Sequence, residues 1–235
     1  MDSITSLQIK PSNYGILWRA LSIATLVGTL GIAGALLFIP EIGLPLFWGV
    51  IVPILPAVFL FAPGIWRNIC PMAFLNQLPR EYKFTREMKL SPAIAKYSFS
   101  ISCFLLLFLV SARKWLFDKS GIATVGLAVF GLAMAFTGGL LFKGMSGWCS
   151  VFCPILPVEK LYGQARFLKV ETAYCRPCIR CTKNCYNAMP DTAAFLEQND
   201  PDKSYAGQYR FFAGVFPGFV LAFFNTSASM GLAIS

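Results

Sequence analysis

Four of the eight cysteines lie close together, at Cys175, Cys178, Cys181 and Cys185. Their spacing, C-x2-C-x2-C-x3-C, matches the bacterial run that binds 4Fe–4S clusters, except that Tyr186 follows where proline is usual. A short loop of this kind wraps three thiolates around three irons of a cubane, and soft thiolates suit iron–sulfur clusters and zinc. Zinc is the alternative, but structural zinc sites favour paired cysteine knuckles. The run therefore predicts a 4Fe–4S cluster.

The fourth cysteine of such a run usually ligates a different cluster, so the cubane needs a thiolate from elsewhere in the chain. Two segments offer one, GIWRNICPMAF and SGWCSVFCPIL, because each has an aromatic-rich lead and ends around a Cys-Pro pair. In this comparison Cys70 aligns with Cys153, and Trp66 aligns with Cys149. We interpret the two segments as a degenerate internal repeat of two helix pairs, each finishing in a Cys-Pro element.

Proline is favoured in the first turn of a helix, so a cysteine just before it faces free backbone N–H groups and the positive helix end. That environment is expected to lower the thiol pKa and to favour an anionic cluster. The alternative is that Cys70, Cys149 and Cys153 are turn residues below a membrane helix.

The number of thiolates limits the number of clusters. One cubane is completed by the first three cysteines of the run and one Cys-Pro thiolate. Two cubanes need eight thiolates, and seven are clustered, so a second cluster would require Cys103, another kind of ligand, a partner's ligand or a three-iron form. Cys103 lies alone in an apolar run, where a packing role is the simpler explanation. One cluster is predicted and a second is left open. The predicted ligands are Cys70, Cys149, Cys153, Cys175, Cys178, Cys181 and Cys185.

The elements that must carry these cysteines are membrane helices. The chain is 56% hydrophobic and 13% charged, whereas soluble domains carry about 25% charged residues. Five apolar stretches approach the roughly 20 residues that a spanning helix needs. They are 14–39, 44–62, 93–111, 121–142 and 211–235. We predict an all-α integral membrane protein with about five transmembrane helices and a small cytoplasmic ferredoxin-like iron–sulfur loop region.

Three parts of the chain follow from this assignment. Residues 1–142 hold the first four spans and a cytoplasmic loop at 64–92, residues 143–209 form the cytoplasmic iron–sulfur region, and residues 210–235 form the fifth span. Prolines at 45, 53 and 56 are expected to kink the second span. In the fourth, small residues at 131, 135 and 139 allow close helix contact, although a glycine-rich helix without a specific partner is an equal alternative.

Basic residues set the orientation. They gather between spans two and three and between spans four and five, whereas the opposite face has Arg113, Lys114 and Lys119 between spans. Because positive residues stay cytoplasmic, the N-terminus and the clustered cysteines are predicted on the cytoplasmic side of a bacterial inner or thylakoid-type membrane. Disulfides are disfavoured there, so the thiols are free for metal. The net charge of +9 is assigned to topology, and no nucleic-acid motif accompanies it.

Several kinds of chemistry are excluded by composition. The chain has no histidine, which excludes bis-histidine haem, histidine-ligated copper or zinc, and histidine acid–base catalysis. No glycine-rich nucleotide fingerprint and no convincing nucleophile–base pair is present. We therefore predict no catalytic residue and interpret the chain as a subunit that relays electrons, with its status as an enzyme left open.

The motifs at 149–154 and 175–185, with the predicted spans, resemble the membrane-bound polyferredoxin-like 4Fe–4S proteins of the NapH/NosR/CcoG type. The likeness covers most of the chain at the level of layout. It implies electron transfer between quinol or cytoplasmic donors and redox partners. Several members have two complete ferredoxin runs, whereas this chain has one, with Tyr186 after it, and Trp66 replaces one repeat cysteine.

Four further residues are candidates for contact with a cofactor. Arg176 and Arg180 are expected to raise the cluster potential and to steer an acidic carrier such as a soluble ferredoxin, unless they are only solvated surface charges. An aromatic cleft near Trp66, Trp148 and neighbouring phenylalanines is a candidate quinone site. Expected partners are membrane lipid, other redox subunits or a soluble acidic electron carrier. The alternatives are an assembly or maturation factor for a membrane redox complex and a thiol–disulfide oxidoreductase that uses Cys149 and Cys153.

Overall fold

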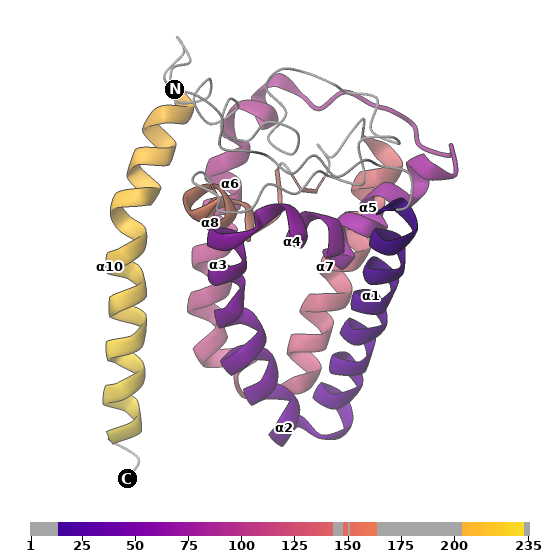
Figure 1. Ribbon diagram of the computed structural model, residues 1–235. Coiled ribbons are helices and arrows are strands. Elements are labelled where there is room, and N and C mark those ends of the chain that lie inside the picture. Colours follow the sequence, from indigo (N-terminus) through magenta and orange to yellow (C-terminus); the bar gives the residue numbers. More distant parts are fainter. Residues whose placement is uncertain (1–13, 143–147, 150, 164–203, 233–235) are drawn as a thin grey trace, which may run out of the picture.

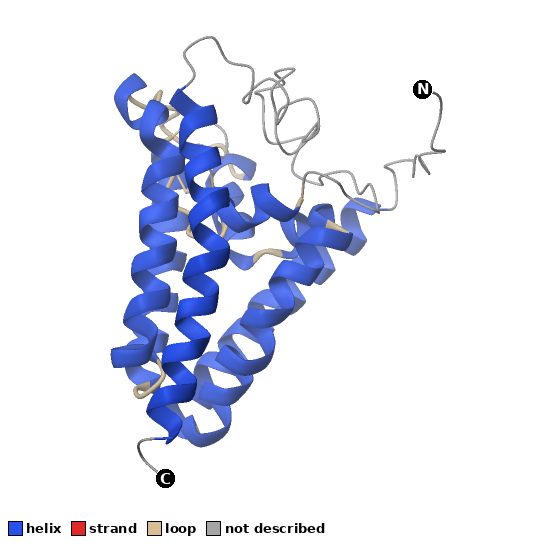
Figure 2. Cartoon of the chain, turned by 90° about the vertical axis from the view of Figure 1, so that its left-hand side faces the viewer, coloured by secondary structure: helices blue, strands red, loops and turns tan. Residues whose placement is uncertain are grey.

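The computed structural model describes residues 14–142, 148–149, 151–163 and 204–232. Within these ranges nearly all regular structure is helical and no strand is formed, as Figure 2 shows. The all-α class predicted from the hydrophobic pattern is confirmed for the described chain.

Four helical stretches of the described chain are long and apolar enough to cross a membrane. They coincide with the first four predicted spans, and most of their side chains lie on the protein surface, where lipid would surround them. The fifth predicted span falls in α10 (Ser204–Leu232), which is not among the four, so it stays a prediction. The four are Ile16–Phe38 in α1 (Tyr14–Phe38); Pro40–Phe61 in α2 (Pro40–Pro45), η1 (Leu46–Ile51) and α3 (Val52–Phe61); Lys96–Phe117 in α6 (Pro92–Ala112) and η2 (Arg113–Phe117); and Gly121–Leu141 in α7 (Gly121–Leu141).

Prolines divide the second span into three helical segments. Pro45 is the last residue of α2, and the six residues of η1 that follow it form π-type hydrogen bonds. Pro53 lies in the first turn of α3, and Pro56 lies inside that helix. A proline has no N–H to donate and crowds the preceding turn, so the helix accommodates it by a local change of hydrogen-bond pattern.

Three short helices gather toward one end of the bundle, opposite the end marked by α2 (Figure 1). They are α4 (Pro63–Ile69), α5 (Pro71–Glu81) and α8 (Leu156–Tyr162). Each begins with a proline in its first turn, as helix N-termini favour.

Two of these short helices, α5 and α8, each pack against a span of the opposite half of the chain. α5 follows the first Cys-Pro element and packs against α1 of its own half and α7 of the other half. α8 follows the second Cys-Pro element and packs against α6 of its own half and α3 of the other half. The two segments predicted to form an internal repeat are therefore followed by helices that pack in the same way, each between the first span of its own half and the second span of the other half.

The stripe of small residues on α7 has a specific partner, which is α5. A methyl group added at Gly139 would lie 2.0 Å from the backbone oxygen of Asn76, and one added at Gly131 would lie 2.9 Å from Cε of Met72. Ala135 is fully buried, and its carbonyl accepts a 2.8 Å hydrogen bond from Nδ2 of Asn76. The close helix contact predicted for this stripe is therefore present, although its partner is a short helix and not a second span.

The carboxyl end of α7 is tied down by the chain that follows α5. The backbone N–H groups of Arg86 and Met88 donate to the carbonyls of Leu140 and Leu141 at 2.7 and 2.9 Å. The last carbonyls of a helix have no hydrogen-bond donor within the helix, so these bonds supply donors to carbonyls that would otherwise lack one. They also fix the point from which the chain leaves toward Cys149.

Candidate metal centre

Cys70 occupies the position just before the first turn of α5, as the Cys-Pro pattern predicts. Its backbone is extended, Pro71 follows in the first turn of the helix, and the backbone N–H groups of Met72 and Ala73 act to lower the pKa of the thiol. Such N–H groups at a helix start have no carbonyl partner within the helix, so they are free to donate to a sulfur anion.

Cys153 repeats this arrangement. Its thiol interacts with the backbone N–H groups of Ile155 and Leu156, which stand two and three residues further along, as Met72 and Ala73 do from Cys70. The two Cys-Pro elements therefore present their sulfurs to backbone donors in the same register.

The backbone just before each Cys-Pro element is held in the same way in both halves. Oγ of Ser22 on α1 donates to the carbonyl of Asn68 at 2.7 Å, and Oγ of Ser102 on α6 donates to the carbonyl of Val151 at 2.7 Å. Each carbonyl belongs to the residue two positions before the cysteine. All four residues are buried, so an unmade bond here would leave a carbonyl without water or protein partner. These serines position the two sulfurs relative to the spans.

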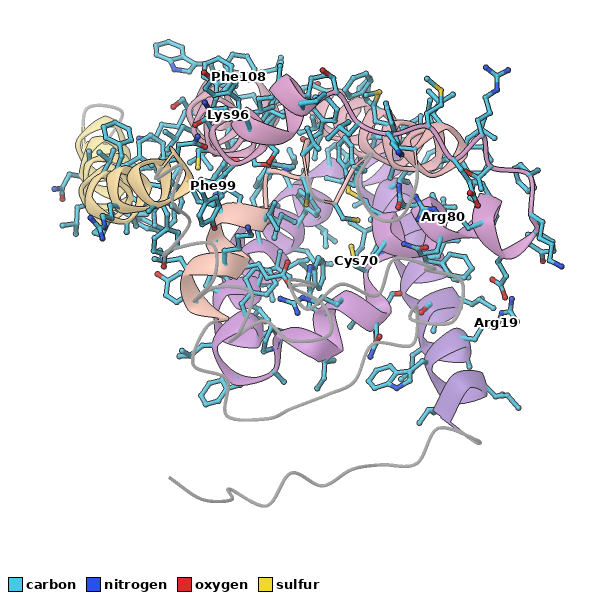
Figure 3. All side chains as sticks on the ribbon, turned by 90° about the horizontal axis from the view of Figure 1, so that it is seen from above. Arg19, Cys70, Arg80, Lys96, Phe99 and Phe108 are labelled. Carbon is cyan, nitrogen blue, oxygen red and sulfur yellow. The ribbon has the colours of Figure 1, made fainter. Side chains whose placement is uncertain are left out.

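The half-buried cysteines Cys70, Cys149 and Cys153 lie in one region of the molecule. A negative charge on Cys153 or Cys70 raises the pKa of Cys149, and a charge on Cys70 raises the pKa of Cys153, so the three sulfurs lie within electrostatic reach of one another. Figure 3 shows Cys70 and Arg80 inside the outline of the helices, whereas Arg19 lies at its edge. Residues from both halves of the chain are thus brought together.

The expected lowering of the thiol pKa does not occur in the chain as described. Burial raises the pKa of Cys70 to about 11 and that of Cys153 to about 12, and it raises the pKa of Cys149 well above the ordinary value. The backbone N–H groups lower the pKa of Cys70 and Cys153, but desolvation is the larger effect. The sequence prediction considered the helix end and did not include the burial of the sulfur.

Arg80 brings a positive charge to this region from α5. Its guanidinium lowers the pKa of Cys149 against the dominant effect of burial, and it donates to Oε1 of Gln77 at 2.8 Å and to the carbonyl of Phe142 at 2.9 Å. Asn76, Gln77 and Arg80 are all buried, so the polar face of this amphipathic helix is turned inward. A buried arginine favours nearby negative charge.

Arg67 and Glu159 form a second buried polar contact beside the thiols. Nε of Arg67 on α4 donates to Oε1 of Glu159 on α8. The Glu159 carboxylate raises the pKa of all three described cysteines of the centre, so it too lies near the sulfurs.

The aromatic residues predicted to form a quinone cleft have separate neighbours. The ring of Trp66 packs edge-on against Phe59, with centroids 5.8 Å apart, and Trp148 is buried with its ring near Gly131. Among the ring contacts of the described residues, Trp66 and Trp148 do not pair with each other. A quinone site between them stays a prediction.

The ferredoxin-like run lies outside the described residues. This applies to Cys175, Cys178, Cys181 and Cys185, and also to Arg176 and Arg180.

The described donors do not by themselves form a metal site. Among the described residues no group of three or more Cys, Asp or Glu side chains is arranged to hold one metal ion. A cubane binds each thiolate to a separate iron, so its sulfurs need not converge on one point. Three half-buried free thiols, with backbone N–H groups and an arginine near them, are donors of the kind that an anionic iron–sulfur cluster requires, and a cluster here stays a prediction.

Comparisons with known proteins do not assign the chain. No protein-family model matches it, and neither the curated proteins nor the solved structures contain a match. The resemblance to polyferredoxin-like membrane proteins therefore stays a prediction based on motifs.

The buried polar side chains of α5 and α8 were not predicted from the sequence. A signal for them exists, because a polar pair stands six and seven residues after each cysteine of a Cys-Pro element, Asn76–Gln77 in one half and Glu159–Lys160 in the other. In a chain this apolar, a polar pair repeated at the same offset indicates an inward-facing role.

Proposed function

We propose that this chain is a membrane-anchored iron–sulfur subunit that relays single electrons between a cytoplasmic or quinol donor and a redox partner. The observation that supports it is that the half-buried Cys70, Cys149 and Cys153 lie within electrostatic reach of one another, with backbone N–H groups at a helix start beside two of the three sulfurs. Thiols that serve only packing have no need of free backbone donors or of residues from both halves of the chain.

A bound 4Fe–4S cluster would supply the one-electron chemistry, and the chain would hold and shield it. Cys70, Cys149 and Cys153 would act as ligands together with cysteines of the 175–185 run. The backbone N–H groups at the starts of α5 and α8 would stabilise the thiolates, and Arg80 would offset part of their charge. Metal binding deprotonates a thiol. Because burial raises the thiol pKa of these cysteines, they would become thiolates only when a bound metal supplies compensating positive charge.

The charged and aromatic residues around the cluster would determine which redox partners exchange electrons with it. The cluster region would lie on the cytoplasmic side of a bacterial inner or thylakoid-type membrane, where Arg176 and Arg180 would raise its potential and attract an acidic electron carrier. A quinone near Trp66 and Trp148 is the alternative donor. Whether the chain holds a second cluster depends on how Cys185 is used.

Thiol–disulfide exchange by Cys149 and Cys153 is disfavoured by their environment. Burial raises the pKa of both thiols, so few thiolates are available at neutral pH, and the thiolate is the attacking species in disulfide exchange.

The experiment is low-temperature EPR of anaerobically purified, dithionite-reduced protein, with iron and acid-labile sulfide quantified. We expect Cys153→Ser and Cys178→Ser each to remove a cubane signal and to lower the iron content. Cys103→Ser is the matched control, because this thiol lies within the span Lys96–Phe117, and it should leave both unchanged.

Two results would contradict the proposal. One is a purified chain without iron and sulfide, and the other is a spectrum unchanged by Cys178→Ser. Recovery of the chain with a stable redox complex would favour an electron-transfer subunit, whereas transient association during assembly would favour a maturation factor.

A further inference from the structure

Trp148 presents a buried hydrogen-bond donor with no acceptor in the described part of the chain. The residue is 7% exposed, and its indole Nε1 is buried and unpartnered. Tryptophan N–H groups usually find a partner when they are buried, so this one points to an acceptor that the described protein atoms do not provide.

The position of the ring relates this donor to two of the thiols. Trp148 precedes Cys149, and its carbonyl accepts hydrogen bonds from the backbone N–H groups of Phe152 and Cys153 at 3.0 Å each. The turn that fixes the backbone position of Cys153 therefore also fixes the backbone position of Trp148, which carries the indole.

The indole lies next to α7 and to the side chain of Met72 from α5. A methyl group added at Gly131 would lie 3.8 Å from Cζ2 of Trp148 and 2.9 Å from Cε of Met72, so both side chains border the same point on α7. Cζ2 adjoins the ring carbon that carries Nε1. Met72 also provides one of the backbone N–H groups that face the Cys70 sulfur. The indole therefore lies beside the side chain of Met72, a residue in the first turn of α5.

Gln77 offers a second donor of the same kind. It is 1% exposed and its Nε2 is unpartnered among the described residues, whereas its Oε1 accepts a 2.8 Å hydrogen bond from Nη1 of Arg80. That bond fixes the amide, so Nε2 is held as a donor. Since the charge of Arg80 acts on the Cys149 thiol, Gln77 is hydrogen-bonded to a residue within electrostatic reach of that sulfur.

We propose that Nε1 of Trp148 and Nε2 of Gln77 donate hydrogen bonds to sulfur atoms of the iron–sulfur centre. The inference rests on the proposed function, because it assumes that a cluster is bound there. Hydrogen bonds to cluster sulfurs stabilise the more negative, reduced form and raise the reduction potential. Trp148 then acts through its N–H group, and not as a platform on which a quinone stacks.

The test compares two tryptophans whose indole N–H groups are both buried without a partner among the described residues, one beside the cysteines and one in the second span. Trp148→Phe keeps an aromatic ring and removes the N–H. Trp48→Phe is the matched control, because Nε1 of Trp48 is also buried and unpartnered, but the residue lies in η1 and packs against Phe47 and Phe117. The readout is the midpoint potential of the cluster, from a redox titration followed by EPR.

We expect a shift to a more negative potential in Trp148→Phe, a shift of the same sign in Gln77→Met, and none in Trp48→Phe. A second readout uses the unaltered chain with ¹⁵N-labelled indole. Pulsed EPR should detect coupling between the reduced cluster and an indole nitrogen, and Trp148→Phe should lose it.

The outcomes separate this inference from the proposed function. A normal cluster signal with unchanged potential in Trp148→Phe would overturn the inference and leave the function intact. If Trp148→Phe fails to retain its cluster, the indole coupling in the unaltered chain decides, and its absence overturns the inference. An unaltered chain that binds no iron would overturn the proposed function itself.

Discussion

Arg67 and Glu159 form a buried ion pair that joins the helix before Cys70 to the helix after Cys153. The side chains are 6% and 11% exposed, so little water reaches them. Each residue belongs to a different half of the internal repeat. The pair therefore holds the two Cys-Pro elements at a fixed separation, which any centre that uses both sulfurs requires.

Glu159→Gln should strongly destabilise the chain, because it removes the negative charge that faces the buried Arg67 guanidinium. The expected loss is about 3–5 kcal/mol of unfolding free energy. The control is Glu81→Gln, which removes the partner of Arg19 in a pair whose side chains are 53% and 39% exposed, and which should cost about 0–1 kcal/mol. Thermal unfolding in detergent compares the two. Equal losses would contradict a structural role for the buried pair.

Gly139→Ala should separate α5 from α7. The added methyl group would meet the backbone oxygen of Asn76 at 2.0 Å, and backbone cannot rotate away as a flexible side chain can. Overpacking of this kind costs about 1–3 kcal/mol. Gly126→Ala on the same helix meets nothing within 4 Å and should be neutral or stabilising, because alanine favours helix. Unfolding in detergent measures both, and similar stabilities of the two variants would argue against the close contact.

Ser102→Ala should loosen the turn that carries Cys149 and Cys153, because the carbonyl of Val151 loses its 2.7 Å partner. The loss is about 1–3 kcal/mol for a buried group left unpaired. Ser22→Ala should have a similar effect on the turn before Cys70. The measurement is the rate at which a small alkylating reagent modifies each cysteine in metal-free protein, located by mass spectrometry.

The expected pattern is selective. Ser102→Ala should expose Cys153 more than Cys70, and Ser22→Ala should do the reverse. Thr137→Val is the control, since its hydroxyl bonds to the carbonyl of Ala133 on an exposed surface. General acceleration at every cysteine in all three variants would show global loosening and contradict the local role.

Much of this architecture could be predicted from the sequence, because its signals are local. Apolar length identified the first four spans, and the alignment of Cys70 with Cys153 identified the repeat. Pro71, which follows Cys70, correctly indicated the first residue of α5, whereas Pro154, which follows Cys153, lies in a turn and α8 begins two residues later at Leu156. These features depend on residues within one or two turns of each other.

Two features could not be predicted, because they depend on burial and on distant partners. The pKa of Cys70 is set by desolvation, which spacing does not report. Similarly, nothing in the order of residues pairs Arg67 with Glu159, or turns the polar face of α5 toward α7. Such contacts arise only when the helices after each Cys-Pro element cross to the opposite half.

The distribution of basic residues predicts which ends of the spans face the cytoplasm, and introduced cysteines can test it. Lys119 and Lys89 are both exposed, and they lie beyond opposite ends of α6 and η2. In intact cells, a membrane-impermeant maleimide should label Lys119→Cys, whereas Lys89→Cys should react only after the membrane is opened. The unaltered chain, which has eight cysteines of its own, gives the background, and mass spectrometry locates the label at the introduced cysteine. Labelling of Lys89→Cys in intact cells, with Lys119→Cys protected, would invert the topology and put the cysteine centre on the outer side, where a soluble cytoplasmic donor has no access to it.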